Sequence, residues 1–568
     1  MPAIHIENLW FRYPSPLLDG EPVKALCGIN LDIQAGEFLA VMGPVGAGKS
    51  SLCLALSGAI PHAVEGEMEG TVTIWDRDTQ QVPVGELCKE VGFCFEDAET
   101  QLFNATVADE VAFGLETAGL PAEEIERRID QALALVGLDG TRNRIPHSLS
   151  GGEQKRLAMA CALAMQPTVL VLDDPTAGLD ARGRHEVLKA VERLRHGNTR
   201  TTIVMATQDA EAAATFADRI AVLENGQLVA LLAPAELFAQ PQKLSAWGIA
   251  TPQLARLAAH CDLPVVLSVD DALEQWQGTP FLQRSCLRPS VPQTAPPGQT
   301  VIEVHDVTYE YVDTDQSALR GITLDIHEGE WLAVIGINGS GKSTLIKHLN
   351  GLLRPSRGTV QLQGQDTQTQ QVGILAHTVG YVAQNPDRSI FCATVRDEVA
   401  YGPKQLGLSG RELETRVQET LELFDLAGLA DSPPAALGYG LRRQVALASI
   451  LAMRTPVLVL DEPTTGQDER ITRRLMDVLS HRHSTGTTIV MVTHDLALVE
   501  RYAQRVVALH DGTVAAQGTV RDVLSDDGLL GSIGLRSLPV TALAKALGWA
   551  PPLPVSELDW KVNGVQCD

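Results

Sequence analysis

Two copies of a phosphate-binding loop constrain the fold of this 568-residue chain more than any other feature. The pattern G-x-x-x-x-G-K-[ST] occurs as GPVGAGKS at residues 43–50 and as GINGSGKS at 336–343. In this loop, backbone N–H groups surround the phosphates, the lysine reaches the β- and γ-oxygens, and the hydroxyl binds Mg²⁺. Two nucleotide-binding units are therefore expected. Their predicted contacts are Gly43, Gly46, Gly48, Lys49, Ser50 and Ser51 in the first loop, and Gly336, Gly339, Gly341, Lys342, Ser343 and Thr344 in the second.

The rest of the chain is also duplicated. VGFCFEDAETQLFNATVADEVAFG from Val91 matches VGYVAQNPDRSIFCATVRDEVAYG from Val379, and VLVLDDPTAGLD from Val169 matches VLVLDEPTTGQD from Val457. The pairs Glu96/Gln384, Leu149/Leu437 and Asp173/Asp461 are each separated by 288 positions. A constant offset across separate motifs predicts that one fold occurs twice.

Each half has the pattern of an α/β protein. The apolar runs FLAVMG and WLAVIG before the loops, and VLVLDD and VLVLDE later, are typical of buried parallel strands. A third run in each half, TTIVMATQD and TTIVMVTHD, ends in polar residues. Ligands of open α/β sheets bind beyond the carboxyl ends of the strands. These tips should therefore meet at one nucleotide in each half.

The duplication also suggests domain limits. We expect nucleotide-binding domains at 1–240 and 301–525, small C-terminal appendages at 241–287 and 526–568, and a linker at 288–300. RPSVPQTAPPGQT in the linker is Pro-rich and polar, which is typical of a semi-rigid spacer. The appendages share a short apolar helical pattern followed by a Pro break. They could add packing to the core or form a contact between the halves.

Composition narrows the class of protein. With 45% hydrophobic and 20% charged residues, the chain is typical of a globular protein. It has no run of about 18 uncharged apolar residues and no signal-peptide pattern at its start. The net charge of −25 disfavours a nucleic acid as partner. Nine scattered cysteines, none in C-x-x-C spacing, indicate reduced cytosolic thiols without a metal cluster.

The segment LSGGEQKR, from Leu149 to Arg156, resembles the signature of ABC-type ATPases. The resemblance covers roughly residues 3–240 and 301–525. It implies, in each half, a central mostly parallel sheet, an antiparallel β subdomain, a helical signature subdomain and a small appendage. It also implies ATP and Mg²⁺ as ligands. In the family, the signature closes over the nucleotide held by the opposite domain, so the two halves should pair head to tail within the chain.

Within that family, DAETQLFNATVADEVAFGLETAGLPAEEI and ATVRDEVAYGPKQLGLSGREL resemble the ATPase subunits of energy-coupling factor importers of vitamins and of cobalt or nickel. This resemblance implies an integral membrane coupling protein and a substrate-binding membrane protein as partners, on the cytoplasmic face of the cell membrane. The cargo stays open, because the membrane component recognises it.

The resemblance assigns a complete composite site, called site B, to the second phosphate loop. Glu462 matches the general base, His494 the switch histidine at the γ-phosphate, and Gln384 the glutamine that contacts Mg²⁺ and water. Asp461 matches the Mg²⁺ aspartate and Tyr311 the aromatic that stacks on adenine. The signature for this site is Ser150, Gly151 and Gly152 of the first half.

Site A joins the first phosphate loop to the second-half signature and departs from the pattern. Glu96 replaces the glutamine, Asp174 the base and Gln208 the switch histidine, while LGYGLRRQ puts Gly438 and Tyr439 into the signature. The residues that keep the expected identity are Lys49, Ser50, Asp173 and Tyr13.

All these departures affect the same composite site. Asp174 is one methylene shorter than Glu, and a catalytic group misplaced by about 1 Å can cost on the order of 10²-fold in rate. Gln208 cannot carry a proton as histidine can. The sequence thus predicts that site B hydrolyses ATP and that site A binds it as a structural clamp. The alternatives are a soluble tandem ATPase acting on ribosomes and a non-transport regulatory ATPase. We expect Lys155 and Arg156, after the signature, to lie on a solvated helix face.

Overall fold

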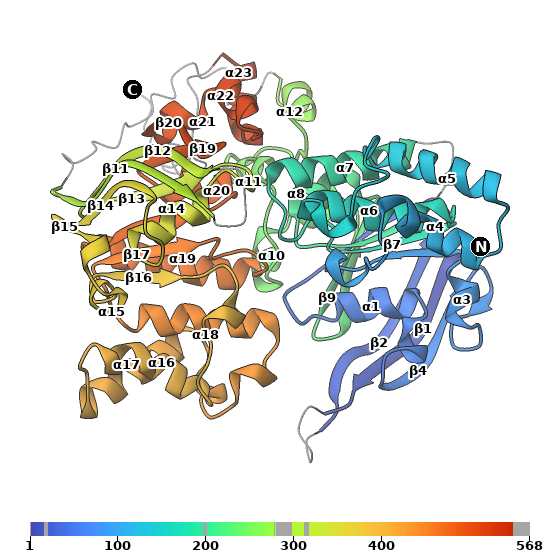
Figure 1. The fold of residues 1–568 in the computed structure, drawn as a ribbon. Helices are drawn as coiled ribbons and strands as arrows, with labels where there is room; N and C mark the ends of the chain where they lie inside the picture. The colour runs from blue at the N-terminus through green and yellow to red at the C-terminus, as the bar shows by residue number, and fades with distance from the viewer. Residues whose placement is uncertain are drawn as a thin grey trace. The chain divides into compact units, whose positions relative to one another are not determined.

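The computed structural model describes residues 2–15, 21–196, 201–277, 279, 298–311 and 317–548 (Figure 1). The chain forms two compact units, one of residues 1–281 with 468–471 and one of the remaining residues, called the first and second half below. The predicted linker lies outside the described residues except for 298–300, and so do residues 549–568 of the predicted second appendage.

A six-stranded sheet forms the centre of the first half, with strand order β10-β9-β3-β8-β7-β6. The strands from β9 to β6 pair in parallel, and β10 pairs antiparallel with β9. Every residue of β3, β7 and β8 is buried, which explains their continuous apolar sequences. The strands are β3 (Phe38–Met42), β6 (Val91–Cys94), β7 (Val169–Asp173), β8 (Thr202–Ala206), β9 (Arg219–Glu224) and β10 (Gln227–Leu232).

A smaller antiparallel sheet packs beside it, with strand order β2-β1-β4-β5. Alternate residues of β1, such as Ile4 and Ile6, share a core with Leu39 and Val41 of β3, so the two sheets are held by a common apolar layer. The strands are β1 (Pro2–Tyr13), β2 (Val23–Gln34), β4 (Glu67–Ile74) and β5 (Arg77–Asp78).

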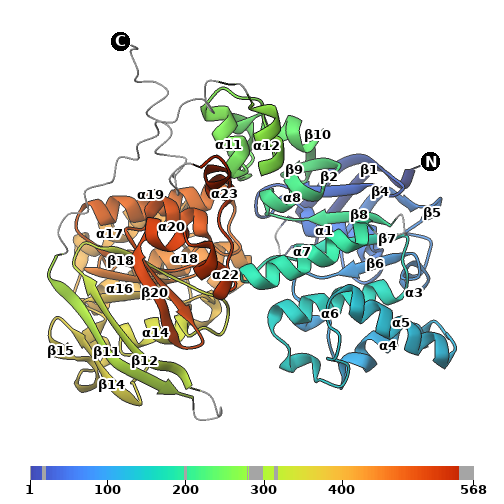
Figure 2. The same cartoon turned by 90° about the horizontal axis from the view of Figure 1, so that it is seen from above.

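Helices α4, α5 and α6 pack against one another as a helical subdomain (Figure 2). Their buried residues join the core on the other face of the parallel sheet. The helices of the first half are α1 (Lys49–Leu56), α2 (Ala59–His62), α3 (Val84–Leu87), α4 (Val107–Thr117), α5 (Ala122–Leu135), α6 (Gly151–Ala164), α7 (Ala181–His196), α8 (Ala210–Phe216), α9 (Pro234–Phe238), α10 (Pro241–Ala246), α11 (Gln253–His260) and α12 (Val269–Gln275), with 3₁₀ turns η1 (Ala98–Thr100) and η2 (Pro146–Ser148).

The second half repeats this architecture. Its sheets have the orders β16-β17-β18-β13-β19-β20 and β12-β11-β14-β15. The strands are β11 (Thr300–Glu310), β12 (Ser317–His327), β13 (Trp331–Ile335), β14 (Arg357–Leu362), β15 (Gln365–Asp366), β16 (Val379–Val382), β17 (Val457–Asp461), β18 (Thr488–Val492), β19 (Arg505–His510) and β20 (Thr513–Thr519). The helices are α14 (Lys342–Leu349), α15 (Val372–Leu375), α16 (Val395–Gln405), α17 (Gly410–Leu423), α18 (Tyr439–Leu451), α19 (Glu469–Ser484), α20 (Leu496–Tyr502), α21 (Val520–Leu524), α22 (Asp527–Ser532) and α23 (Pro539–Ala546), with 3₁₀ turns η3 (Thr367–Thr369), η4 (Pro386–Arg388), η5 (Ala427–Leu429) and η6 (Pro434–Ala436).

The predicted fold class is confirmed: each half has a mostly parallel sheet, an antiparallel sheet and a helical subdomain. The first appendage packs on its own half, because Ile249 and Ala255 belong to the same core as Phe238. The backbone N–H of Gln253 also donates to the Glu211 carboxylate at 2.8 Å. Within the described ranges, no helix is both long and apolar enough to cross a membrane.

Candidate functional site

The two phosphate loops have nearly the same internal geometry. Each follows a buried strand, β3 or β13, and leads into a helix whose N-cap glycine, Gly48 or Gly341, has a φ of 100°. Only glycine adopts this left-handed backbone readily. The Lys49 ammonium donates to the carbonyls of Gly43 and Pro44 at 2.8 and 2.9 Å. Lys342 makes the matching pair of bonds in its own loop, both at 2.8 Å.

A serine and an aspartate form the candidate Mg²⁺ contact of each half. The Ser50 hydroxyl donates to Asp173 at 3.1 Å, and the Ser343 hydroxyl donates to Asp461 at 3.2 Å. Burial raises the pKa of both aspartates, and the serine hydroxyls partly offset that rise. Mg²⁺ is usually held by one or two such oxygens together with phosphate oxygens and water. The donor set in both halves therefore fits Mg²⁺ bound with a nucleotide.

The aromatic residues predicted to stack on adenine stand beside the loop helices. The Tyr13 and Ser51 hydroxyls lie 3.1 Å apart, and the Tyr311 and Thr344 hydroxyls lie at the same distance. In the second half, Tyr311 lines a cavity of about 320 Å³ that also reaches the phosphate loop, Gln384 and Glu462. This volume is within the range of small-molecule sites.

In the second half, the predicted base and switch residues contact each other. Glu462 follows β17 and His494 follows β18, and the His494 Nδ1 lies 2.8 Å from the Glu462 carboxylate. The Thr465 hydroxyl donates to the same carboxylate oxygen at 3.2 Å. Burial lowers the pKa of His494, but the hydrogen bond and charge of Glu462 outweigh it and raise this pKa overall. The carboxylate is therefore oriented by two contacts, and Glu462 lines the nucleotide cavity.

The corresponding residues of the first half are arranged differently. The Gln208 amide donates to the carbonyl of Gly43 in the phosphate loop at 3.1 Å. Burial, reinforced by the negative charge of Glu96, raises the pKa of Asp174 to about 7. Glu96 itself is exposed. Asp174 thus has a pKa well above its ordinary value, and its side chain is one methylene shorter than that of Glu462.

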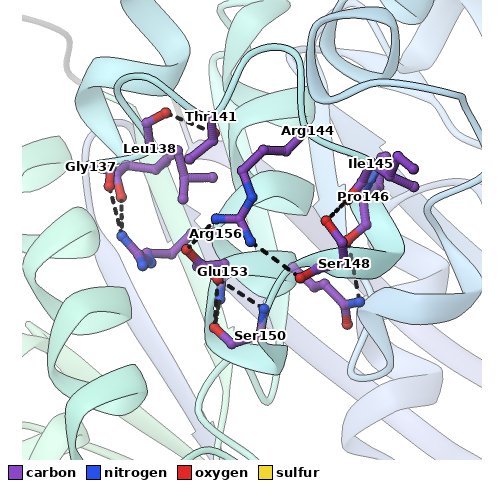
Figure 3. Close-up of polar contacts among 12 residues, drawn as sticks. Gly137, Leu138, Thr141, Arg144, Ile145, Pro146, Ser148, Ser150, Glu153 and Arg156 are labelled. Carbon is purple, nitrogen blue, oxygen red and sulfur yellow. Dashed lines mark hydrogen bonds and ion pairs between the residues drawn. The ribbon is translucent and has the colours of Figure 1, made fainter. Parts of the chain in front are cut away.

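The first-half signature begins helix α6 and is held by a capping box (Figure 3). The Ser150 hydroxyl accepts from the Glu153 backbone N–H at 3.3 Å, and the Glu153 carboxylate accepts from the Ser150 N–H at 2.9 Å. Arg144 links that carboxylate to the carbonyl of Ser148. Ser150 and Gly151 are exposed at this helix N-terminus, where N–H groups favour an anion.

The second-half signature keeps the backbone but changes the side chains. The N-cap Gly438 of α18 has φ −62° and ψ 157°, close to −64° and 156° at Ser150. It makes no side-chain cap, and Tyr439 occupies the next position as an exposed aromatic. Arg442 lies near the Tyr439 ring and pairs with Asp387 at 2.7 Å. The departure is therefore chemical, not conformational.

The prediction that Lys155 and Arg156 lie on a solvated face is wrong. The Lys155 ammonium donates to the carbonyls of Asp174 and Ala177, at 3.2 and 2.7 Å. Arg156 donates to the carbonyls of Val136 and Gly137, each at 3.0 Å. Both side chains turn inward because loop carbonyls without helical partners lie beside α6.

Sequence reasoning also missed the role of Arg443. Its side chain is only 2% exposed and donates to the carbonyls of Gln384, Glu462 and Pro463. A signal was available, because Arg443 lies 288 positions after Lys155, the same offset as the other paired motifs.

In each half, a pair of exposed aromatic rings follows in the chain after Glu96 or Gln384. Phe103 and Phe113 form the first aromatic pair, with centroids 5.0 Å apart, and Phe391 and Tyr401 form the second, at 4.7 Å. Phe103 is 63% exposed and Phe391 65%. A buried carboxylate fixes each turn: Glu110 accepts from the backbone N–H of Phe103, and Glu398 does so for Phe391. The aromatic pairs are therefore held in place on the surface.

Comparison with known proteins places this geometry in a family. The ABC transporter family model matches residues 26–177 and 319–465. The "Putative ABC transporter ATP-binding protein" of Caldanaerobacter subterraneus subsp. tengcongensis is 37% identical, covering 96% of both chains. A protein of the same description from Methanosarcina mazei is 35% identical, covering 96% of this chain and 94% of the relative. The solved structure of cbiO1 from Clostridium perfringens, described as part of the ABC transporter complex cbiONQ, is 31% identical, covers 43% of this chain and 95% of that one, and has a TM-score of 0.37. The chain therefore belongs to the ABC transporter family, as an ATP-binding protein with two ABC ATPase domains.

Proposed function

We propose that this chain is the ATP-hydrolysing motor of a membrane importer of the energy-coupling factor type, bound at the cytoplasmic face of the cell membrane. ATP binding closes the two halves head to tail, and hydrolysis reopens them. The observation that carries the proposal is that the residues around the two phosphate loops differ, although the loops themselves match. In one half Glu462 contacts His494, whereas in the other half Asp174 stands at the base position and Gln208 donates to the Gly43 carbonyl.

Site B is the proposed hydrolytic site. Lys342 and Ser343 hold the phosphates and Mg²⁺, Glu462 orients the attacking water, and His494 contacts the γ-phosphate. When bound, Mg²⁺ neutralises the charge that develops on the phosphates. The first-half signature, headed by Ser150, supplies N–H groups and a hydroxyl to the same phosphate.

Site A is proposed to bind ATP without turning it over at a useful rate. The hydrogen bonds of its Lys49 and of its Ser50–Asp173 pair have the same lengths as those of the other half within 0.1 Å. However, Gly438 and Tyr439 remove the signature hydroxyl and crowd the approach to the phosphate. Losing one catalytic donor of this kind costs about 3–4 kcal/mol of transition-state stabilisation. The nucleotide in site A would then act as a clamp between the halves.

The aromatic pairs are the proposed docking surfaces for an integral membrane coupling protein. Each pair presents rigid rings next to the segment that starts at Glu96 or Gln384, so an apolar helix of the partner can pack on the rings. Aromatic anchors of this kind dominate binding energy at interfaces. Exposed Asp97 and Glu99 make the first surface acidic, whereas the second exposes Arg388 beside Asp387, whose charge is paired with Arg442. The two surfaces would therefore select different segments. A substrate-binding membrane protein would carry the cargo, either a vitamin-like molecule or a transition-metal ion.

The test is purification of the full chain from detergent-solubilised membranes, with ATPase activity measured in parallel. We expect an integral membrane protein to copurify and to stimulate the ATPase. Phe391→Asp should abolish both effects, since losses of about 2 kcal/mol or more in binding free energy are typical when a buried interface anchor is removed. Basal turnover should stay within about 2-fold of the parent. Leu352→Asp is the matched control, because Leu352 is also exposed, at 48%, but lies outside the aromatic pairs.

A chain that copurifies with ribosomes and with no membrane protein would contradict the proposal and favour the soluble tandem ATPase. Equal loss of copurification in Phe391→Asp and Leu352→Asp would contradict the assignment of the docking surface.

A further inference from the structure

Arg443 is a buried cation in the segment that has lost the signature. Its guanidinium donates to the Gln384 carbonyl at 2.8 Å, to the Pro463 carbonyl at 3.3 Å, and also to the Glu462 carbonyl. The Tyr439 hydroxyl lies 3.3 Å from the same group. A buried charge is tolerated only when its donors are satisfied, so these carbonyls determine where the side chain lies.

The Glu462 backbone needs such support. Its φ of 50° is in the left-handed region, which residues other than glycine seldom adopt. On one side, the Glu462 N–H donates to the carbonyl of Val492, at the end of β18, at 3.0 Å. On the other side, Arg443 holds the Glu462 carbonyl. Glu462 is thus held on both sides, and its carbonyl also accepts from the Thr465 N–H at 3.3 Å. The position of the residue that carries the base therefore depends in part on Arg443.

The first half holds the equivalent peptide in the same way. Asp174 has a φ of 41°, and its N–H donates to the carbonyl of Ala206 at 2.9 Å. Lys155, 288 positions before Arg443, donates to the Asp174 carbonyl. Among the residues described in the first half, its second hydrogen bond is to Ala177, in the same loop.

Arginine has a longer, forked group with five donors, which explains how Arg443 also reaches Gln384. A second arginine strengthens the same connection. Arg442, which precedes Arg443 on α18, pairs with Asp387 in η4 at 2.7 Å. The start of α18 is therefore fastened both to the loop of the base and to residues 384–387, which adjoin the second aromatic pair.

We propose that Arg443 is a positioning residue that couples the partner-facing segment at Gln384 to the base Glu462 within the second half. A partner that displaces residues 384–387 would move the Arg443 guanidinium and, with it, the Glu462 peptide. The second signature would then have kept a mechanical role after losing its phosphate donors. This inference rests on the proposed function, because it needs Glu462 to be the working base.

Arg443→Met and Arg443→Lys test the link to the base on the full chain. In Arg443→Met we expect kcat to fall about 10- to 100-fold, since small displacements of a catalytic group have that effect. The Kd for Mg-ATP should stay within about 2-fold, because Arg443 does not contact the phosphate loop. Arg443→Lys should recover most of kcat, since Lys155 supports its own loop with the same group. Arg454→Met, which removes an exposed arginine paired with Glu419, is the control and should change neither quantity.

Hydrogen exchange tests the link to Gln384, and it also applies if the methionine variant does not fold. In Arg443→Lys, amides of residues 384–388 should exchange at least about 5-fold faster, while those of 462–466 stay within about 2-fold. Unchanged exchange at 384–388 would overturn the coupling. A kcat of Arg443→Met within about 2-fold of the parent would overturn the positioning role. A fall in kcat accompanied by a parallel rise in the Kd for Mg-ATP in this variant would also overturn it, because it would indicate a general structural defect.

Failure of the proposed function would give a different set of results. Full ATPase activity in Glu462→Gln would contradict the assignment of the base itself. Loss of activity in Glu462→Gln with normal activity in Arg443→Met would contradict only the role of Arg443.

Discussion

The two halves of the molecule share a scaffold and differ in the groups attached to it. Both phosphate loops fold their lysine over the same carbonyls, and both signature helices start from the same backbone conformation. The differences described above lie in side chains, and they include the length of the carboxylate at the base position, the switch residue, the capping hydroxyl and Tyr439 in the second signature. Nucleotide binding depends mostly on the backbone of the loop, whereas hydrolysis depends on placed side chains. A duplicated chain can therefore lose one function and keep the other.

The largest expected effect on ATPase activity comes from placing a negative charge in one signature and not in the other. An ideal Cβ on Gly151 would meet nothing closer than Leu179 at 4.0 Å, so Gly151→Asp should fold. It would place a negative charge where site B needs to receive a phosphate, and steady-state ATPase activity should fall about 100-fold or more. Gly438→Asp puts the same charge into the second signature, where a Cβ would meet nothing within 4 Å, and should keep the activity within about 3-fold. Equal losses in both variants would break the proposed asymmetry.

A variant that restores ATPase activity to site A would test the comparison in the opposite direction. In a Glu462→Gln background, any remaining turnover must come from the first phosphate loop. Adding Asp174→Glu, Gln208→His, Gly438→Ser and Tyr439→Gly should raise the ATPase rate of that background about 10-fold, because it restores the base, the switch and the signature together. No gain, in a variant that still binds ATP and melts normally, would show that site A differs by more than these side chains.

The contact between His494 and Glu462 predicts a pH effect without nucleotide. A raised histidine pKa contributes stability that is complete below the unfolded pKa of about 6.5 and is lost as the pH rises through the folded value. Glu462→Gln removes this contribution, so it should lower Tm more at pH 6 than at pH 9. Thermal melts of both proteins across this range measure the difference. The same difference at both pH values would contradict the ion pair.

The smallest expected effect concerns the helix caps. Ser150→Ala should destabilise the first half by about 1 kcal/mol, because it removes the N-cap acceptor. Gly438→Ser should stabilise the second half by only a few tenths of a kcal/mol, since glycine is already a fair N-cap and Leu441 cannot complete a capping box. Denaturant melts of each variant measure both changes. A stabilisation above 1 kcal/mol in Gly438→Ser would show that the second signature is strained.

Much of the fold was predictable because its signals are local. A window of about a dozen residues is enough to recognise each of the two glycine-rich loops and each apolar strand that ends in Asp173 or Asp461. The inward positions of Lys155 and Arg443 were not predictable in this way. A charged residue on an amphipathic helix is normally solvated, and only the fold brings the carbonyls of Asp174 or Gln384 beside it. The resemblance placed Gln208 at the first phosphate loop, but its bond to the Gly43 carbonyl was not predictable, because the two residues lie far apart in the chain.

The most direct test of the account compares the two base positions. Steady-state ATPase activity and stoichiometric ATP binding should be measured for the parent, Glu462→Gln and Asp174→Asn under identical conditions. We predict that Glu462→Gln loses at least about 100-fold in turnover and still binds ATP, while Asp174→Asn keeps turnover within about 2- to 3-fold. Equal losses in the two variants, or a larger loss in Asp174→Asn, would contradict the assignment of hydrolysis to site B.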